Sequence, residues 1–259
     1  METAVPPMEP QAADPPDGGR RDALDQLSVA LDFPSAAAAL GLVDQLQGAC
    51  RWFKVGMELY YAAGNSIIER LRERGFEVFL DLKLHDIPNT VAGAVRSVSS
   101  TGASLLTLHA AGGEAMMRAA AQAAAVPGGP KLLAVTVLTS MDEAALTAVG
   151  FAGAPGSKIQ AQAMRLARLA QSSGIDGLVC SAEEVAALRE ALGPNALLVV
   201  PGIRPVGAET GDQRRIATPA EAISRGASML VVGRPITQAS DPARAAEAIL
   251  AEMKIKPAG

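Results

Sequence analysis

The sequence predicts an α/β protein in which one folded domain forms a (β/α)8 barrel, and three observations support this prediction. Short apolar runs alternate with stretches of helical period along the chain of 259 residues. Most of these runs are continuously apolar, which is typical of parallel strands covered by helices. A single barrel of this kind uses about 250 residues. A doubly wound open sheet is the alternative, because periodicity cannot show whether a sheet closes.

The expected strands are rich in β-branched and aliphatic residues, and the expected helices in Ala, Leu, Glu and Arg. The strands are Ser28–Leu31, Trp52–Val55, Glu77–Leu82, Leu105–Thr107, Leu132–Val137, Gly177–Val179, Leu197–Val200 and Met229–Val232. The helices span residues 35–47, 64–74, 88–101, 112–125, 157–172, 182–192, 218–226 and 242–253. Thr218-Pro219 and Asp241-Pro242 each supply a capping side chain followed by a first-turn proline, which marks a helix start.

The N-terminal residues differ in composition from the rest of the chain. Residues 1–22 are rich in Pro, Asp and Gly and contain few large apolar side chains. Such a segment cannot bury enough surface to offset the entropy lost on ordering. We therefore expect a disordered Pro-rich tail over residues 1–22 and a single barrel domain over residues 23–259.

Composition excludes several classes of function. The formal net charge of −4 offers no basic excess to neutralise a nucleic-acid backbone. Cys50 and Cys180 form no CxxC pair, which argues against a disulfide framework or a structural zinc site and fits a reduced compartment. Residues 97–113 are uncharged but too polar to cross a membrane, and the N-terminus lacks the pattern of a secretory signal. We expect a cytoplasmic protein that binds neither nucleic acid nor membrane.

The densest cluster of polar side chains lies in the segment FLDLKLHDIPNT, residues 79–90. In an extended strand Asp81 and Lys83 point to the same side, while the alternating leucines, Leu80, Leu82 and Leu84, point outward to the helices. Charged groups that face a barrel interior are costly to bury, so this pair must be compensated or functional. Asp86 follows where the strand should end. A salt-bridged strand end is the alternative interpretation.

Polar residues also follow other expected strands, at the ends that a barrel brings together. They are Asp32, Lys54, Thr139 with Ser140 beside it, Arg204 and Arg234. Each alone could be a surface group, but the C-terminal ends of barrel strands meet at one mouth, where active sites form. The convergence of these residues therefore predicts an active site.

The last two expected strands carry a pattern suited to phosphate binding. VVPGIR and VVGRPI both place a glycine soon after an apolar strand, followed by an arginine. Glycine lets backbone N–H groups approach an anion, and barrel phosphate sites commonly use the loops after strands seven and eight. Long connections at residues 139–157 and 202–213 are candidate lids. His85 and His109 are interpreted as hydrogen-bonding supports near strand ends.

Seven motifs in one order give the sequence a family resemblance. They are LDF, FKVGMEL, DLKLHDIPNT, HAAGG, LTS, PGIR and VVGR, and the resemblance runs from about Val29 to Met253. Together they resemble the bacterial orotidine 5′-phosphate decarboxylases. The resemblance implies a (β/α)8 homodimer that uses no metal and no cofactor. It also implies conversion of orotidine 5′-phosphate to UMP and carbon dioxide, the last step of de novo UMP synthesis.

The resemblance also assigns roles to individual residues. It implies a charged catalytic array of Lys54, Asp81, Lys83 and Asp86, in which Lys83 is the proton donor. Asp86 and Thr90 would reach into the site of the partner subunit. It places Asp32 and Lys54 on the ribose, Thr139 on the pyrimidine, and Gln213, Gly233 and Arg234 on the phosphate, with Arg204 on the same side. The other substrate-binding residues that it implies are Asp81, Asn89 and Thr90.

Two other functions compete with this one. A sugar-phosphate decarboxylase, aldolase or epimerase on a related barrel is the first. Such decarboxylases share the Asp-x-Lys-x-x-Asp motif but hold magnesium partly through a carboxylate where this chain has Lys54, and a lysine repels a divalent cation. The second is a nucleotide-binding protein without activity, against which the intact Lys83, Asp81 and Asp86 argue.

Overall fold

The structure is a computed structural model that describes residues 23–151, 158–205 and 216–254. Its parallel strands form a closed barrel in sequence order, with β1 hydrogen-bonded to β8 through the pairing of Leu27 with Leu230. The strands are β1 Leu27–Ala30, β2 Trp52–Gly56, β3 Glu77–Leu84, β4 Leu105–His109, β5 Lys131–Val135, β6 Gly177–Val179, β7 Leu197–Val200 and β8 Met229–Val232. The predicted (β/α)8 barrel is confirmed, and the open sheet is excluded.

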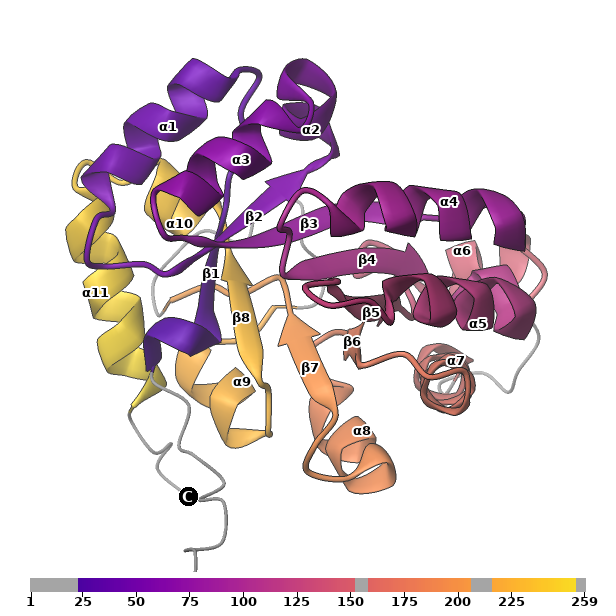
Figure 1. Cartoon of the computed structure of the whole chain (residues 1–259). Coiled ribbons are helices and arrows are strands. Elements are labelled where there is room, and N and C mark those ends of the chain that lie inside the picture. Colours follow the sequence, from indigo (N-terminus) through magenta and orange to yellow (C-terminus); the bar gives the residue numbers. More distant parts are fainter. Residues whose placement is uncertain (1–22, 152–157, 206–215, 255–259) are drawn as a thin grey trace, which may run out of the picture.

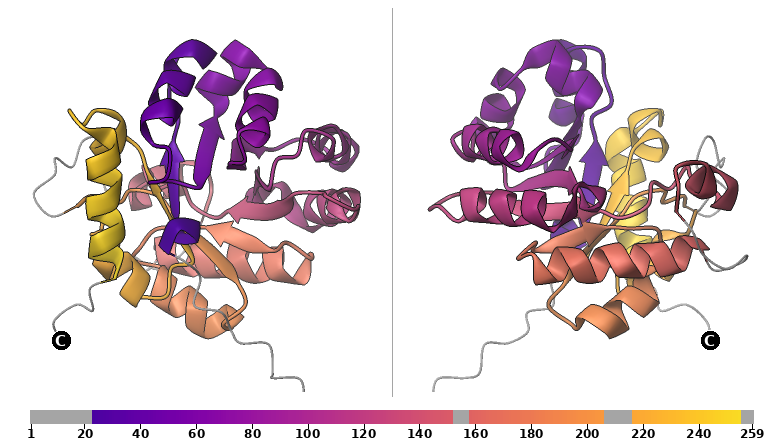
Figure 2. Two further views of the ribbon diagram at one scale, coloured as in Figure 1. Left: turned by 60° about the vertical axis from the view of Figure 1, so that its left-hand side comes forward. Right: turned by 90° about the vertical axis from the view of Figure 1, so that its right-hand side faces the viewer.

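Helices surround the barrel, as the views in Figures 1 and 2 show. Those that correspond to the predicted helices are α1 Ala36–Gln45, α3 Ser66–Glu73, α4 Pro88–Ser99, α5 Gly113–Ala124, α7 Lys158–Ser172, α8 Val185–Leu192, α9 Pro219–Ser224 and α11 Pro242–Met253. Both predicted start signals are confirmed. The Thr218 hydroxyl accepts a hydrogen bond from the Glu221 N–H, and the Asp241 carboxylate accepts one from the Arg244 N–H.

Short helical segments that the sequence did not predict lie within the connections. They are α2 Met57–Ala63, α6 Glu143–Ala148, α10 Arg234–Thr237, and the 3-10 turns η1 Ala23–Gln26 and η2 Ala110–Gly112. Each spans two turns or fewer, so no apolar period can be recognised in its sequence. The helix α2 begins directly after β2 and α10 one residue after β8, and α10 contributes Arg234 and Thr237 to the mouth of the barrel.

The apolar core has two main layers. The larger layer fills the space between strands and helices, and it includes Val29, Leu31 and Leu80, with Leu82 and Leu84 partly buried against it. The smaller layer fills the barrel interior and consists of Ala30, Phe79, Leu105, Leu133, Leu197, Val199, Met229 and Val231, with Trp52 and Val179 against it. The interior is therefore packed at the N-terminal side, and the polar site lies above this packing.

β3 departs from regular strand geometry where its charged residues lie. Leu80 pairs with Leu106 and Leu84 with Leu108, so residues 81–83 of β3 lie opposite residue 107 of β4. Lys83 has φ +52°, a left-handed conformation that only it adopts among the described non-glycine residues. The assumption of strict alternation at Asp81 and Lys83 is therefore wrong, although both side chains still reach the same cavity.

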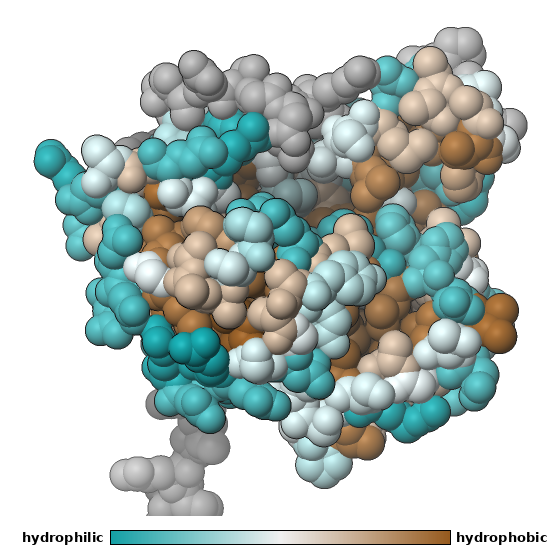
Figure 3. All heavy atoms as spheres, turned by 90° about the horizontal axis from the view of Figure 1, so that it is seen from above, coloured by the Kyte–Doolittle hydropathy of each residue, from teal (hydrophilic) through white to brown (hydrophobic). Residues whose placement is uncertain are grey.

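The outer surface mixes polar and apolar groups. On the face shown in Figure 3, hydrophilic residues are interspersed with small groups of hydrophobic ones. Within the described ranges, no helix is both long enough and apolar enough to cross a bilayer.

Candidate active site

A cavity of about 570 Å³ opens at the C-terminal ends of the strands. Its volume suits a small-molecule ligand. Ala30, Phe79, Val179 and Val231 belong both to the packed barrel interior and to the cavity lining, so they form its floor. The charged side chains around it come from β2, β3 and the segments after β1, β7 and β8, which are the ends that the sequence predicted to converge.

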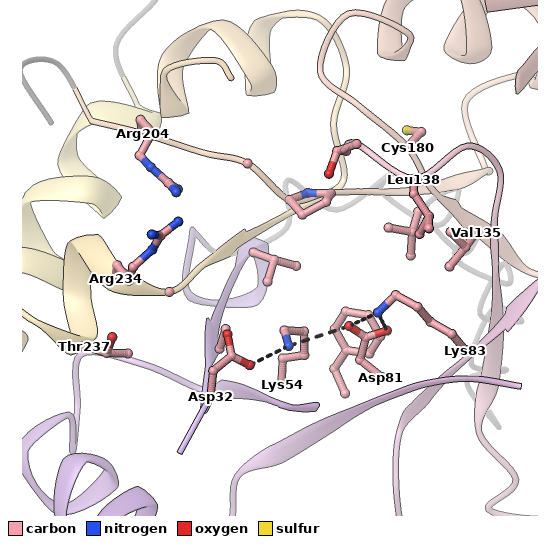
Figure 4. Close-up of a pocket in the computed structure, with 18 of the residues that line it drawn as sticks. Asp32, Lys54, Asp81, Lys83, Val135, Leu138, Cys180, Arg204, Arg234 and Thr237 are labelled. Carbon is pink, nitrogen blue, oxygen red and sulfur yellow. Dashed lines mark hydrogen bonds and ion pairs between the residues drawn. The ribbon is translucent and has the colours of Figure 1, made fainter. Parts of the chain in front are cut away.

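Four alternating charges, which we call the charged row, occupy one end of this cavity (Figure 4). Lys54 Nζ lies 3.2 Å from Asp32 Oδ1 and 3.6 Å from Asp81 Oδ2. Lys83 Nζ donates to both carboxylate oxygens of Asp81 at 2.8 Å. The ammonium groups and carboxylates of Asp32, Lys54, Asp81 and Lys83 thus balance one another in formal charge.

Asp81 is the most enclosed acid of the charged row. Its side chain is 12% exposed, against 62% for Asp32. Burial alone would raise the pKa of Asp81, but the ammonium groups of Lys54 and Lys83 and hydrogen bonds from Lys83 and Thr107 together lower it below its usual value. Asp81 is therefore an ionised carboxylate at neutral pH, buried beside two cations.

Thr107 is a member of this network that the sequence analysis missed. It lies in β4 with no exposed surface, and its hydroxyl donates to Asp81 Oδ1 at 2.9 Å. The same hydroxyl oxygen accepts the Lys83 backbone N–H at 2.8 Å. The sequence pointed to Thr107 only through its single hydroxyl group among the leucines of the segment LLTLH.

Gly56 is a second residue that the sequence analysis missed. It ends β2, and a Cβ atom there would lie 3.1 Å from Lys54 Nζ and 3.2 Å from Asp32 Oδ1. Both distances are tighter than ordinary van der Waals contact. Glycine therefore leaves the space in which the Lys54–Asp32 ion pair forms.

The opposite end of the cavity carries two arginines. In Figure 4 the guanidinium groups of Arg204 and Arg234 point toward one another, away from the charged row. Arg204 is 8% exposed, while Arg234 lies at the exposed edge as the first residue of α10. Gly233 and Thr139, both predicted from sequence, also line the cavity, as do the unpredicted residues Cys180, Thr237 and Gln238. Gln213 lies outside the described residues.

Three predicted site residues do not reach the cavity within one chain. Asp86, Asn89 and Thr90 are all exposed and are not among the described residues that line it. The Asp86 carboxylate instead accepts the N–H of Ile87 at 2.6 Å. Among the described acids, only Asp81 forms an ion pair with Lys83.

The structure does not show the two histidines, His85 and His109, as the hydrogen-bonding supports that the sequence analysis expected. Their rings lie 5.5 Å apart, and within the described part of the chain neither imidazole has a hydrogen-bond partner. Burial, His85 and Lys83 lower the pKa of His109, so its ring is neutral at neutral pH. His109 therefore adds no positive charge beside Lys83.

Comparison with known proteins decides the family. The family model described as orotidine 5′-phosphate decarboxylase / HUMPS matches residues 25–249. The chain belongs to this family. The resemblance found in the sequence motifs is thereby confirmed.

Relatives within the family cover almost the whole chain. A protein from Halorhodospira halophila named orotidine 5′-phosphate decarboxylase is 56% identical over 88% of this chain and 95% of its own length. One of the same name from Moorella thermoacetica is 50% identical over 91% of this chain and 95% of its own. The crystal structure of orotidine 5′-phosphate decarboxylase from Lactobacillus acidophilus has a TM-score of 0.78 at 40% identity, covering 89% of this chain and all of that one. The chain is an enzyme of the carboxy-lyase class.

Proposed function

We propose that this enzyme converts orotidine 5′-phosphate to UMP and carbon dioxide, the last step of de novo UMP synthesis. The observation that carries the proposal is the ion pair of the buried Asp81 with Lys83 at one end of a cavity whose other end holds Arg204 and Arg234. The names of relatives with 50–56% identity support the same substrate. In this proposal the barrel domain over residues 23–259 works in the cytoplasm.

Lys83 supplies the chemistry in this mechanism. The bond between carbon 6 and the carboxylate breaks, carbon dioxide leaves, and the electron pair stays on carbon 6. No adjacent carbonyl or cofactor delocalises that charge, so the ring needs a nearby cation and a proton. The Lys83 ammonium stabilises the developing carbanion and transfers a proton from Nζ to carbon 6. Water then reprotonates the neutral amine.

Asp81 holds the ammonium of Lys83 in place and adds negative charge beside the substrate carboxylate. Departure of carbon dioxide removes the carboxylate charge that Asp81 opposes. Two unit charges about 4 Å apart interact by roughly 4 kcal/mol at an effective dielectric of 20, which corresponds to about a thousandfold in rate. The reaction needs a larger acceleration, and phosphate binding that closes the site supplies the remainder in this proposal.

The rest of the substrate fits the two ends of the cavity. Asp32 and Lys54 bind the ribose hydroxyls, and Thr139 binds the pyrimidine. Arg234, the Gly233 backbone and Gln213 bind the phosphate, with Arg204 on the same side. The separation of the arginines from the charged row in Figure 4 supports this orientation, because phosphate and reacting carbon lie at opposite ends of the nucleotide.

The proposed active form is a homodimer with shared sites. Asp86 and Thr90 would complete the site of the partner subunit rather than their own. Their exposure in the single chain supports this assignment. Ile87, beside Asp86, is 66% exposed, and an apolar side chain in this position fits an interface.

The proposed reaction uses neither metal nor cofactor. The Lys54 ammonium lies within 3.6 Å of both the Asp32 and the Asp81 carboxylates, in the place where a divalent cation would need to bind. A fixed positive charge there repels magnesium. This position of Lys54 favours the nucleotide decarboxylase over a magnesium-dependent sugar-phosphate enzyme of the same family.

One absorbance assay tests the proposal. The purified protein should consume orotidine 5′-phosphate at the same rate with and without a chelator. Lys83→Ala should stay folded and lose at least a hundredfold in turnover, since general acid catalysis alone contributes about 10²–10⁴. An inactive wild type would overturn the substrate assignment. Inhibition by chelator would overturn the metal-free mechanism, and retained turnover in Lys83→Ala would overturn the role of Lys83.

A further inference from the structure

The strand irregularity at Lys83 leaves a backbone group that the β-ladder does not satisfy. Because residues 81–83 lie opposite residue 107 alone, the regular pairing of β3 with β4 is interrupted there. The Lys83 N–H instead donates to the Thr107 hydroxyl oxygen at 2.8 Å. Thr107 is fully buried, so no solvent replaces this contact. A side chain of β4 therefore supports the left-handed backbone of Lys83.

The same hydroxyl fixes the carboxylate that faces Lys83. Its oxygen accepts from the Lys83 N–H, so its own proton is directed to Asp81 Oδ1, 2.9 Å away. Asp81 Oδ1 also accepts from Lys83 Nζ at 2.8 Å. The contacts form a closed ring from the Lys83 backbone through Thr107 and Asp81 to the Lys83 ammonium. Within this ring, Thr107 holds the Lys83 backbone directly and holds the Lys83 ammonium through Asp81.

We infer that Thr107 is a positioning residue that sets the Lys83 ammonium and the Asp81 carboxylate in the geometry for proton transfer. Thr107 is not one of the described residues that line the cavity, so it acts through its two partners and not on the substrate. The inference rests on the proposed function, because it concerns the proton that Lys83 delivers. It predicts that losing the hydroxyl impairs turnover far more than nucleotide binding.

Thr107→Val tests this, since valine keeps the shape and the strand preference of threonine but has no hydroxyl. We expect kcat to fall about 10- to 100-fold, because a buried hydrogen bond to a charged group is lost. The Kd for UMP, measured by calorimetry, should change less than about threefold. Thr107→Ser restores the hydroxyl and should recover most of kcat. Thr101→Val is the matched control, because it removes another buried threonine hydroxyl, which donates to the Val98 carbonyl in the turn between α4 and β4.

A second readout needs no turnover. Amide hydrogen exchange at Lys83 should be at least about tenfold faster in Thr107→Val than in the wild type, because its acceptor is gone, and unchanged in Thr101→Val. If Thr107→Val fails to fold, Thr107→Cys takes its place, because its sulfur forms weaker hydrogen bonds than the hydroxyl oxygen. The kcat of Thr107→Cys is then compared with that of Thr107→Ser. Wild-type kcat in Thr107→Val, or unchanged exchange at Lys83, would overturn the inference. Failure of the proposed function is distinguishable, since the wild type itself would then not consume orotidine 5′-phosphate.

Discussion

Asp81 is the residue on which the interactions of the site converge. It contacts Lys54 from β2, Lys83 from its own strand and Thr107 from β4. A carboxylate that is buried in this way is costly unless such partners compensate it. Removing one cation therefore affects the whole charged row, because the remaining charges lose their balance.

The pH dependence of stability should report the compensation at Asp81. Its pKa in the folded state lies below the usual value of 3.8. A depressed carboxyl pKa gives stability that is present above the unfolded value and is lost as pH falls through the folded value. The difference in unfolding free energy between wild type and Asp81→Asn, measured with urea, should therefore shrink below about pH 4.

The control for this measurement is an exposed acid. Asp44 pairs with Arg74 at the surface, and its side chain is 58% exposed. Asp44→Asn should change the free energy of unfolding by less than about 1 kcal/mol. If the difference between wild type and Asp81→Asn stayed constant from neutral to acidic pH, the assigned electrostatics of Asp81 would be wrong.

At the scale of elements, the segments after β7 and β8 position the two arginines differently. Arg204 follows a short bridge between Ile203 and Ala217, and its backbone N–H donates to the Ala217 carbonyl at 3.0 Å. Arg234 begins α10 at the exposed edge of the cavity. Arg204 is thus buried and fixed in place, whereas Arg234 lies exposed at the entrance of the cavity.

Arg234→Ala should lower kcat/KM for orotidine 5′-phosphate by roughly 10²–10⁴, because charge-assisted contacts with the phosphate are lost. The slow reaction of orotidine without its phosphate should barely change, since that substrate never makes these contacts. Free phosphite should stimulate the truncated reaction in the wild type and much less in the variant. Steady-state kinetics with both substrates measure these effects.

An arginine away from the cavity provides the control for Arg234→Ala. Arg118 forms an exposed ion pair with Glu114 on α5, and Arg118→Ala should leave both reactions unchanged. Equal slowing of both substrates by Arg234→Ala would show that Arg234 supports the fold or the base site instead of the phosphate.

Local apolar patterns were sufficient to predict the strands and the main helices but not the closure of the barrel, and the polar residues after the strands predicted the charged side chains of the cavity. The strands are continuous apolar runs, and the barrel brings Asp32, Lys54 and Lys83 together at their ends. Thr107 was not predicted because its role depends on an irregular pairing between β3 and β4 that no local pattern reveals. Gly56 was missed because its importance lies in the space that it leaves for two other side chains.

At the scale of the whole molecule, the proposed dimer predicts complementation. Lys83→Ala and Asp86→Asn should each be inactive alone. If Asp86 serves the partner's site, each mixed dimer has one site with both defects and one with neither. Random exchange of equal amounts should then restore about a quarter of wild-type activity. The assay is turnover after subunit exchange, confirmed with differently tagged subunits.

The control mixes Lys83→Ala with Asp81→Asn, whose defects lie in the same chain's site and should not complement. Absence of recovery with Asp86→Asn after confirmed exchange would contradict a shared site. Asp86 would then act, if at all, within its own subunit.

The pairing of β1 with β8 also has a consequence for protein synthesis. The charged row is complete once β3 has left the ribosome, but Arg234 comes only after the last strand. Contacts between such distant parts of a chain form only after the entropy of loop closure has been lost, and they form late. A growing chain that lacks β8 therefore contains the charged row and Arg204, but it lacks Gly233 and Arg234, which complete the opposite end of the cavity. Translation must therefore reach the end of the barrel before the cavity has both of its charged ends.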